Sequence, residues 1–224
     1  MNNDHSAVVL LSGGQDSATC LAIACKTYQT VYALGFHYGQ RHLIELEQAS
    51  LLAERAGVSF DVLSLDFFSQ LGSNALIDAQ LPIFSPEGEI PNTFVPGRNL
   101  FFLSAAAAWA MHRDAYALFI GACETDFSGY PDCRGEFIDS AQKTISLALD
   151  RPFEIKAPLM SLDKADIVLK MVDLGCLDWY LLTHTCYEGN RPACGVCPAC
   201  LLRLKGFKKA GVVDPLDYSR PTDV

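Results

Sequence analysis

Short apolar runs alternate with longer segments of helical periodicity along the 224-residue chain. The first run, Ala7–Leu11, is continuously apolar, which is typical of a strand covered on both faces. A Gly-Gly turn follows it directly. Similar runs predict four further strands, at Val31–Phe36, Phe60–Leu65, Ala117–Gly121 and Phe153–Ala157.

Between these runs, apolar residues recur at the spacing of helices. Gly57 and Gly175 are expected to end two of the helices, and Ser161 is a candidate N-cap. The predicted helices are Ser17–Tyr28, Arg41–Ala56, Asn99–Arg113, Glu136–Leu149, Leu162–Leu174 and one that starts near Pro198. Because strands and helices alternate, we expect a five-stranded parallel, doubly wound α/β sheet with right-handed crossovers.

Two segments depart from this alternation. Residues 66–99 contain several prolines and glycines, and so long an irregular stretch is usually functional. Residues from about 178 to 210 are rich in cysteine and predict a small appendage. With no repeat or linker between them, we expect residues 1–224 to form a single domain.

The charge of the chain narrows the class of partner. The formal net charge is −9, and no basic block is larger than the one around Lys205–Lys209. Because binding to long nucleic acid requires phosphate neutralisation, small-molecule partners are expected instead. The longest apolar stretch, Leu100–Met111, is shorter than the about 20 residues that span a membrane. The first residues lack the basic start of a signal peptide, so no membrane partner and a cytoplasmic location are expected.

Four of the nine cysteines lie close together near the C-terminus. They have the spacing C-x7-C-x2-C-x2-C, which is typical of tetrahedral zinc held by four thiolates, a structural site with no open position. An Fe–S cluster, disulfides and four buried free thiols are the alternatives. The four predicted ligands are Cys186, Cys194, Cys197 and Cys200. The sequence assigns no role to the other five, which are Cys20, Cys25, Cys123, Cys133 and Cys176.

The first strand is followed by the segment Ser12-Gly-Gly-Gln-Asp-Ser17. Ligands bind beyond the carboxyl ends of parallel strands, and this segment lies there. Gly13 and Gly14 allow the backbone to approach a phosphate, which would face the N–H groups that open the helix. Asp16 is unusual in an anion site, and this suggests a bridging Mg²⁺. An ordinary Gly-Gly turn is the alternative interpretation.

Ser-Gly-Gly-x-Asp-Ser resembles the PP-loop of the N-type ATP pyrophosphatases. The resemblance implies that ATP is cleaved between its α and β phosphates and that AMP is attached to an oxygen of the substrate. It also implies that the ATP-binding residues are Leu11, Ser12, Gly13, Gly14, Gln15, Asp16, Ser17, Ala18 and Thr19.

Further segments resemble one family within that superfamily. They are Phe36–His42, Asn92–Asn99, Glu124–Arg134, Pro158–Met160 and Lys164. Together with the PP-loop and the four cysteines they are similar to the 7-cyano-7-deazaguanine synthase family of queuosine biosynthesis, over about residues 7–207. The resemblance implies a sheet of the adenine nucleotide alpha hydrolase type. The chain departs from the family at His37, where aspartate is more common.

The resemblance also implies a reaction. A 7-carboxy-7-deazaguanine carboxylate is adenylated, and ammonia displaces AMP to give the amide. A second ATP activates the amide oxygen, and elimination leaves the nitrile. The implied partners are this substrate, ATP with Mg²⁺ and free ammonia, and the implied assembly is a homodimer.

Candidate residues for this chemistry lie near predicted strand ends. Lys164 and Arg98 could neutralise phosphate or carboxylate charge beside Asp16, although Lys164 could equally be a solvated helix lysine. Of the expected substrate contacts, Asp126 could hydrogen-bond the amino-pyrimidinone edge of a guanine-like ring, and Tyr130 or Phe127 could stack on it. Asp132 and Arg134, which follow the fourth predicted strand, are also expected to reach the substrate. Arg41 could instead pair with Glu45 on its own helix. His37 and His42 are expected to be structural or surface residues.

Two other functions would fit the same motifs. Another PP-loop amide ligase or a tRNA-modifying thiolase would share the loop, but a thiolase would need a reactive cysteine and a basic RNA surface. A zinc-stabilised nucleotide-binding module without catalysis would share both motifs. Release of AMP and pyrophosphate that depends on a substrate would distinguish an enzyme from such a module.

Overall fold

A computed structural model describes residues 5–71, 74–77, 80–81, 90, 92–124 and 130–220. Its sheet has five strands in the order β3-β2-β1-β4-β5, and every neighbouring pair is parallel. The strands are β1 Ser6–Leu10, β2 Thr30–His37, β3 Ser59–Ser64, β4 Ala117–Phe119 and β5 Glu154–Lys156. The predicted five-stranded parallel sheet is confirmed.

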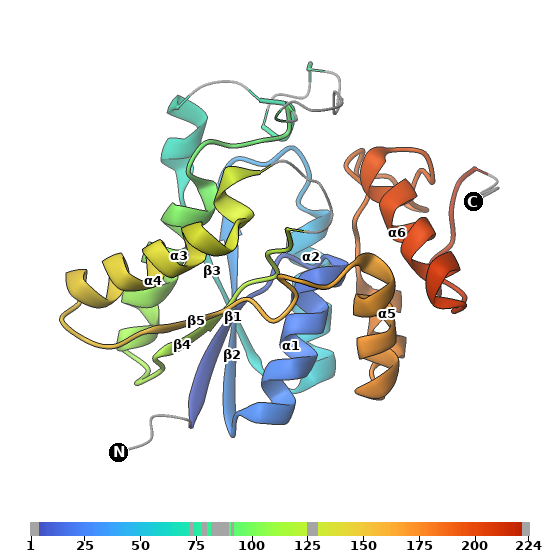
Figure 1. Cartoon of the computed structure of the whole chain (residues 1–224). Coiled ribbons are helices and arrows are strands. Elements are labelled where there is room, and N and C mark those ends of the chain that lie inside the picture. The colour runs from blue at the N-terminus through green and yellow to red at the C-terminus, as the bar shows by residue number, and fades with distance from the viewer. Residues whose placement is uncertain are drawn as a thin grey trace.

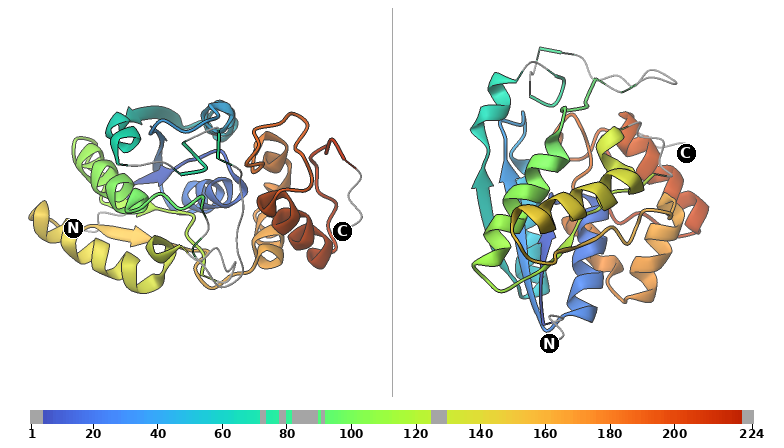
Figure 2. Two further views of the ribbon diagram at one scale, coloured as in Figure 1. Left: turned by 90° about the horizontal axis from the view of Figure 1, so that it is seen from above. Right: turned by 60° about the vertical axis from the view of Figure 1, so that its left-hand side comes forward.

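Helices cover both faces of this sheet, as Figures 1 and 2 show. Helices α1, α2 and α5 lie on one face, and α3 and α4 lie on the other. The helices are α1 Gln15–Thr27, α2 Ile44–Ala56, α3 Arg98–Met111, α4 Gly135–Ala148, α5 Lys164–Asp173 and α6 Pro198–Ala210. Short 3₁₀ helices occur at Asp66–Gln70, Pro131–Cys133 and Leu177–Leu182.

The position of β1 at the centre of the sheet explains why its residues from Ala7 to Leu10 are all apolar. Ala7 and Val9 are fully buried in the core shared with α1, whereas Val8 and Leu10 are buried in the core shared with α3 and α4. Successive side chains of a strand point to opposite faces, so a strand covered on both sides must be apolar throughout.

The order of the strands fixes where a ligand can bind. The chain passes from β1 to β2 and β3 on one side and then returns to β4 on the other side of β1. A doubly wound sheet has its ligand crevice at such a switch point, beyond the carboxyl ends of the strands. The Ser12–Ser17 segment after β1 and Gly121–Cys123 after β4 meet there, since a Cβ on Gly121 would lie 3.0 Å from the Asp16 Cβ.

The cysteine-rich region packs onto this frame through α6, which lies beside α5 at the right of Figure 1. The contact is close, because a Cβ on Gly206 of α6 would lie 2.5 Å from the Lys164 Cβ. Arg203 of α6 is fully buried, and its Nε lies 2.8 Å from an Asp214 carboxylate oxygen. This ion pair holds the segment after α6 against the helix. Among the described residues, no helix is long and apolar enough to cross a membrane.

Two predicted helix starts are wrong. Helix α5 begins at Lys164, and its N-cap is Asp163 rather than Ser161. Asp163 accepts hydrogen bonds from the Ala165 and Asp166 amides at 2.8 and 3.0 Å, and Asp166 accepts one from the Asp163 amide at 3.2 Å. This reciprocal capping box satisfies more amides of the helix than a serine upstream could.

The second correction concerns α2, which begins at Ile44 and not at Arg41. Arg41 precedes the helix, and its guanidinium donates to the Ala75 carbonyl at 3.0 Å. The i,i+4 pairing with Glu45 is therefore wrong, because that spacing brings side chains together only inside a helix.

Candidate functional site

The Ser12–Ser17 segment is held in place by its backbone. The Gly13 carbonyl accepts a hydrogen bond from the His184 amide at 2.8 Å, which ties the loop to the segment that leads into the four cysteines. Gly13 has φ +81°, and a Cβ there would lie 2.2 Å from the Glu45 carbonyl oxygen. Both the conformation and the contact with α2 therefore require glycine.

The serines of the loop hold the first turn of α1. The Ser17 hydroxyl donates to the Gly14 carbonyl at 3.0 Å and accepts from the Ser12 amide at 3.2 Å. The two serine hydroxyls lie 3.1 Å apart. The N-cap is Gly14, so no side chain occupies the amides at the start of α1. The first-turn residues of α1 line the cavity described below. The positive end of the helix therefore faces the crevice, where it favours an anion.

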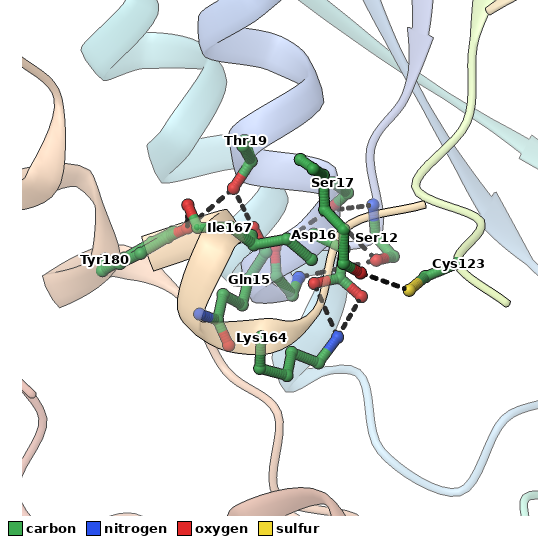
Figure 3. Close-up of polar contacts among 11 residues, drawn as sticks. Ser12, Gln15, Asp16, Ser17, Thr19, Cys123, Lys164, Ile167 and Tyr180 are labelled. Atoms are coloured by element: carbon green, nitrogen blue, oxygen red, sulfur yellow. Dashed lines mark hydrogen bonds and ion pairs between the residues drawn. The ribbon is translucent and has the colours of Figure 1, made fainter. Parts of the chain in front are cut away.

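Asp16 and Lys164 form an ion pair beside this loop, as Figure 3 shows. The Lys164 Nζ lies 2.8 and 2.7 Å from the two carboxylate oxygens of Asp16. The lysine side chain is only 12% exposed. Lys164 is therefore part of the site, and the interpretation as a solvated helix lysine is wrong.

The remaining residues of the loop region pack inward. The Thr19 hydroxyl lies 2.7 Å from the Tyr180 hydroxyl and donates to the Gln15 carbonyl at 2.9 Å. Burial raises the pKa of Tyr180, so it stays protonated. Ala18 and Thr19 are fully buried in the core and do not line the cavity described below, whereas Leu11, Ser12, Gly14, Gln15, Asp16 and Ser17 do.

A cavity of about 340 Å³ extends from this loop toward the N-terminal ends of α2 and α3. Its lining also includes Glu45 from the first turn of α2 and Arg98 from the start of α3, and we call the part of the cavity lined by side chains of α2 and α3 its far end. Burial raises the pKa of Glu45 to about 7, and the nearby Arg98 guanidinium opposes that rise. Arg98 also donates to the Tyr38 hydroxyl at 3.4 Å.

Of the predicted substrate residues, Tyr130 lines this cavity. Its hydroxyl is hydrogen-bonded to that of Thr93, and its ring stacks on Phe94 at 5.8 Å between centroids. Asp132 is buried and supports α3, because it accepts a hydrogen bond from the Asn99 amide at 3.0 Å. Neither Asp132 nor Arg134, the exposed N-cap of α4, lines the cavity.

Two predicted residues, Asp126 and Phe127, lie outside the described residues. Glu45, Tyr38 and Tyr187 line the cavity but were not predicted to contact substrate. Glu45 reads as an ordinary first-turn helix carboxylate, and only the packing of α2 against the loop brings it to the cavity.

The four cysteines predicted as metal ligands lie together, with all four sulfurs within 4.8 Å of one another. The Cys194 Sγ accepts from the Cys197 amide at 3.2 Å, and the Cys194 and Cys200 sulfurs are 3.9 Å apart. Tetrahedral zinc with ligand bonds near 2.3 Å requires sulfurs about 3.8 Å apart. The donor set therefore fits a four-coordinate metal.

The family model described as queuosine biosynthesis protein QueC matches residues 6–211. The chain belongs to this family. Curated relatives named 7-cyano-7-deazaguanine synthase include those of Bacteroides fragilis, 51% identical, and Laribacter hongkongensis, 46% identical. The alignments cover 93% and 96% of this chain and 97% and 96% of those proteins.

A solved structure of lower similarity shares the fold. The U34-tRNA thiolase NcsA from Methanococcus maripaludis, with its [4Fe-4S] cluster, superposes with a TM-score of 0.52 over 93% of this chain and 68% of that one. Its sequence is 14% identical, so the likeness concerns the fold alone. It agrees with the parallel α/β sheet expected from the sequence.

Proposed function

We propose that this protein is a 7-cyano-7-deazaguanine synthase, an ATP-dependent ligase that converts 7-carboxy-7-deazaguanine and ammonia to the nitrile. The observation that carries the proposal is the Ser12–Ser17 loop with its Asp16–Lys164 pair in a chain of the QueC family. The relatives that bear this enzyme name align over nearly their whole length.

The first half of the proposed reaction makes an amide. A carboxylate oxygen attacks the α phosphorus of ATP, the bond to the β phosphate breaks, and pyrophosphate leaves. Ammonia then attacks the acyl carbon, loses a proton, and displaces AMP with its electron pair. The products of this half are the amide, AMP and pyrophosphate.

The second half makes the nitrile at the same loop. The amide oxygen attacks a second α phosphorus, pyrophosphate leaves, and the nitrogen loses one proton. Loss of the remaining proton from nitrogen and of AMP from carbon forms the triple bond. One loop can serve both halves because each begins with an oxygen that attacks phosphorus at the α position.

The residues of the loop have clear roles in such a reaction. The open N-terminus of α1 would bind phosphate oxygens through its amides. Asp16 offers carboxylate oxygens to the Mg²⁺ that accompanies ATP. Lys164 offers a positive charge to the departing pyrophosphate, and it is already held at the loop by Asp16. Catalysis of this kind depends on orientation and on charge neutralisation.

We further propose that the four cysteines hold one structural zinc ion. A full set of thiolates leaves no coordination position for a substrate, so the metal would stabilise the fold and take no part in the reaction. The position of the four cysteines supports this role. Cys186 lies two residues after His184, and the His184 amide donates a hydrogen bond to the Gly13 carbonyl of the loop.

The buried thiols near the cavity argue against thiolation. A thiolase needs a cysteine that ionises readily, so that it can carry sulfur. Burial raises the pKa of Cys133, which lines the cavity, to about 11. Burial also raises the pKa of Cys20 on α1.

The proposal is tested by incubating the protein with ATP, Mg²⁺, ammonium and 7-carboxy-7-deazaguanine and following the products by mass spectrometry. We expect the amide first, then the nitrile, with AMP released only when the deazaguanine is present. AMP formed with another carboxylic acid, and no amide or nitrile from the deazaguanine, would overturn the assignment of substrate.

A further inference from the structure

The cavity has a second charged centre in addition to the Asp16–Lys164 pair. Glu45 enters it from α2 and Arg98 enters it from α3. Arg98 donates a hydrogen bond to the Tyr38 hydroxyl, and Tyr130 lines the same cavity. The far end of the cavity therefore combines a carboxylate, a guanidinium and aromatic rings.

The Glu45 carboxylate has unused capacity to accept hydrogen bonds. Its backbone is fixed, because the Glu45 carbonyl lies against Gly13 of the loop. Its side chain is half-buried and reaches the cavity. Within the described ranges, no hydrogen bond is made to this carboxylate. The carboxylate therefore faces the cavity with its acceptor capacity free for a ligand that carries N–H donors.

Arg98 is placed beside it as a donor. One of its N–H groups reaches the Tyr38 hydroxyl, at 3.4 Å, and the guanidinium lies 5.7 Å and 6.0 Å from the ring centres of Tyr38 and Phe102. A guanidinium carries five N–H donors, so this contact leaves others for a ligand. The pair thus presents a two-oxygen acceptor next to a fixed donor.

This pattern complements one edge of a guanine-like ring. That edge carries two adjacent donors, N1–H and the 2-amino group, followed by the O6 acceptor. A carboxylate accepts from the first two and a guanidinium donates to the third. Adenine, by contrast, offers one amino donor next to the N1 acceptor, whose lone pair would face the carboxylate.

We infer that Glu45 selects the substrate by accepting hydrogen bonds from N1–H and the 2-amino group of the deazaguanine, while Arg98 donates to O6. The inference rests on the proposed function. The carboxylate is attached to C7 of the five-membered ring, on a different edge of the molecule, so it can face the Ser12–Ser17 loop. Tyr130 and Tyr187, which also line the cavity, supply flat surfaces for the ring.

The test compares two substrates on two proteins. The substrates are 7-carboxy-7-deazaguanine and its analogue without the 2-amino group. The proteins are the wild type and Glu45→Gln, which keeps the size of the side chain but replaces one acceptor oxygen with a donor. The matched control is Glu54→Gln, an exposed position on the same helix. KM and kcat are measured for each substrate and for ATP.

We expect the wild type to prefer the 2-amino substrate by at least about 10-fold in kcat/KM, since a hydrogen bond to a charged group is worth about 1.5–3 kcal/mol, or roughly 10- to 150-fold. In Glu45→Gln this preference should fall to within about 3-fold, through a rise in the KM of the deazaguanine. The KM of ATP should stay unchanged in this variant, and Glu54→Gln should behave like the wild type.

Three results would overturn the role of Glu45 while the proposed function stood. The first is full discrimination in an active Glu45→Gln protein, and the second is a rise in the KM of ATP instead of that of the deazaguanine. The third is equal use of both substrates by the wild type, which needs no variant. If the wild type formed no amide or nitrile at all, the proposed function itself would fail.

Discussion

The two ends of the cavity are built in different ways. At the loop end, one contiguous segment supplies most of the polar groups, and backbone contacts such as the bond from the His184 amide to the Gly13 carbonyl hold it. At the far end, side chains converge from α2, α3 and the end of β2. Because backbone contacts fix the loop end, we expect most substitutions there to disturb its conformation. At the far end the cavity receives the ends of side chains, so we expect a change such as Glu45→Gln to alter specificity more than stability.

The largest effect is expected from Gly13→Ala. A Cβ at this position would lie 2.2 Å from the Glu45 carbonyl, and φ is +81°, so either the loop or α2 must move. We expect AMP formation to be abolished and the midpoint of urea unfolding to fall. Gly57→Ala is the matched control, because Gly57 has φ +70° but nothing within 4 Å of the added atom. It should cost only about 1–2 kcal/mol and keep activity, and equal damage by both changes would refute the crowding argument.

Cys197→Ser should disturb both ends of the cavity at once. The four-cysteine region carries His184, which binds the loop, and Tyr187, which lines the cavity. Structural zinc contributes folding free energy directly, so we expect loss of metal, a lower melting temperature and poor solubility. Metal analysis should find about one zinc per wild-type chain and no visible chromophore, and a brown preparation with iron would contradict zinc. Cys25→Ser, outside the cluster, should keep its metal.

Asp16→Asn should affect only the loop end. The change keeps the volume of the side chain but removes the charge that holds Lys164, so we expect AMP formation to fall by at least about 100-fold. Circular dichroism should show an intact fold. Asp178→Asn, at an exposed ion pair with Arg55, is the control and should change stability by less than about 1 kcal/mol. An Asp16→Asn enzyme with normal rates would remove the role assigned to the carboxylate.

The smallest effect is a pH dependence that belongs to the far end. Burial raises the pKa of Glu45 to about 7, against the influence of Arg98, and Tyr38 and Tyr187 face the same group. Protonation removes acceptor capacity, so the KM of the deazaguanine should rise severalfold as the pH falls from about 8 to 6. The KM of the Glu45→Gln variant should stay flat over that range. An equal slope in both proteins would assign the titration to another group.

The loop end of the cavity could be predicted from the sequence, whereas much of the far end could not. The Ser12–Ser17 motif and the four cysteines are local patterns, so their residues were predicted by number and lie together in the structure. Glu45 and Tyr187 are distant in sequence and carry no motif of their own. Only the packing of α2 and of the cysteine region against the loop brings them to one cavity.

Errors in the predicted fold have local causes. The predicted strands and helices lie near their observed places, because most of the apolar runs are buried against one or both faces of the sheet. The start of α5 was misplaced because a capping box outweighs an isolated serine, and the hydrogen bonds of Asp163 decide it. The support that Asp132 gives to α3, through the hydrogen bond from the Asn99 amide, is a contact that no sequence pattern predicts.

The claim that the Ser12–Ser17 loop attaches AMP to a substrate oxygen in two rounds is tested most directly with an isotope. 7-Carboxy-7-deazaguanine labelled with ¹⁸O in both carboxylate positions is converted with ammonia and unlabelled ATP, and the mass of the released AMP is measured by mass spectrometry. We predict that AMP from the first round carries one ¹⁸O and that the AMP released on nitrile formation carries the other. Unlabelled AMP, or ¹⁸O found in inorganic phosphate, would contradict the account.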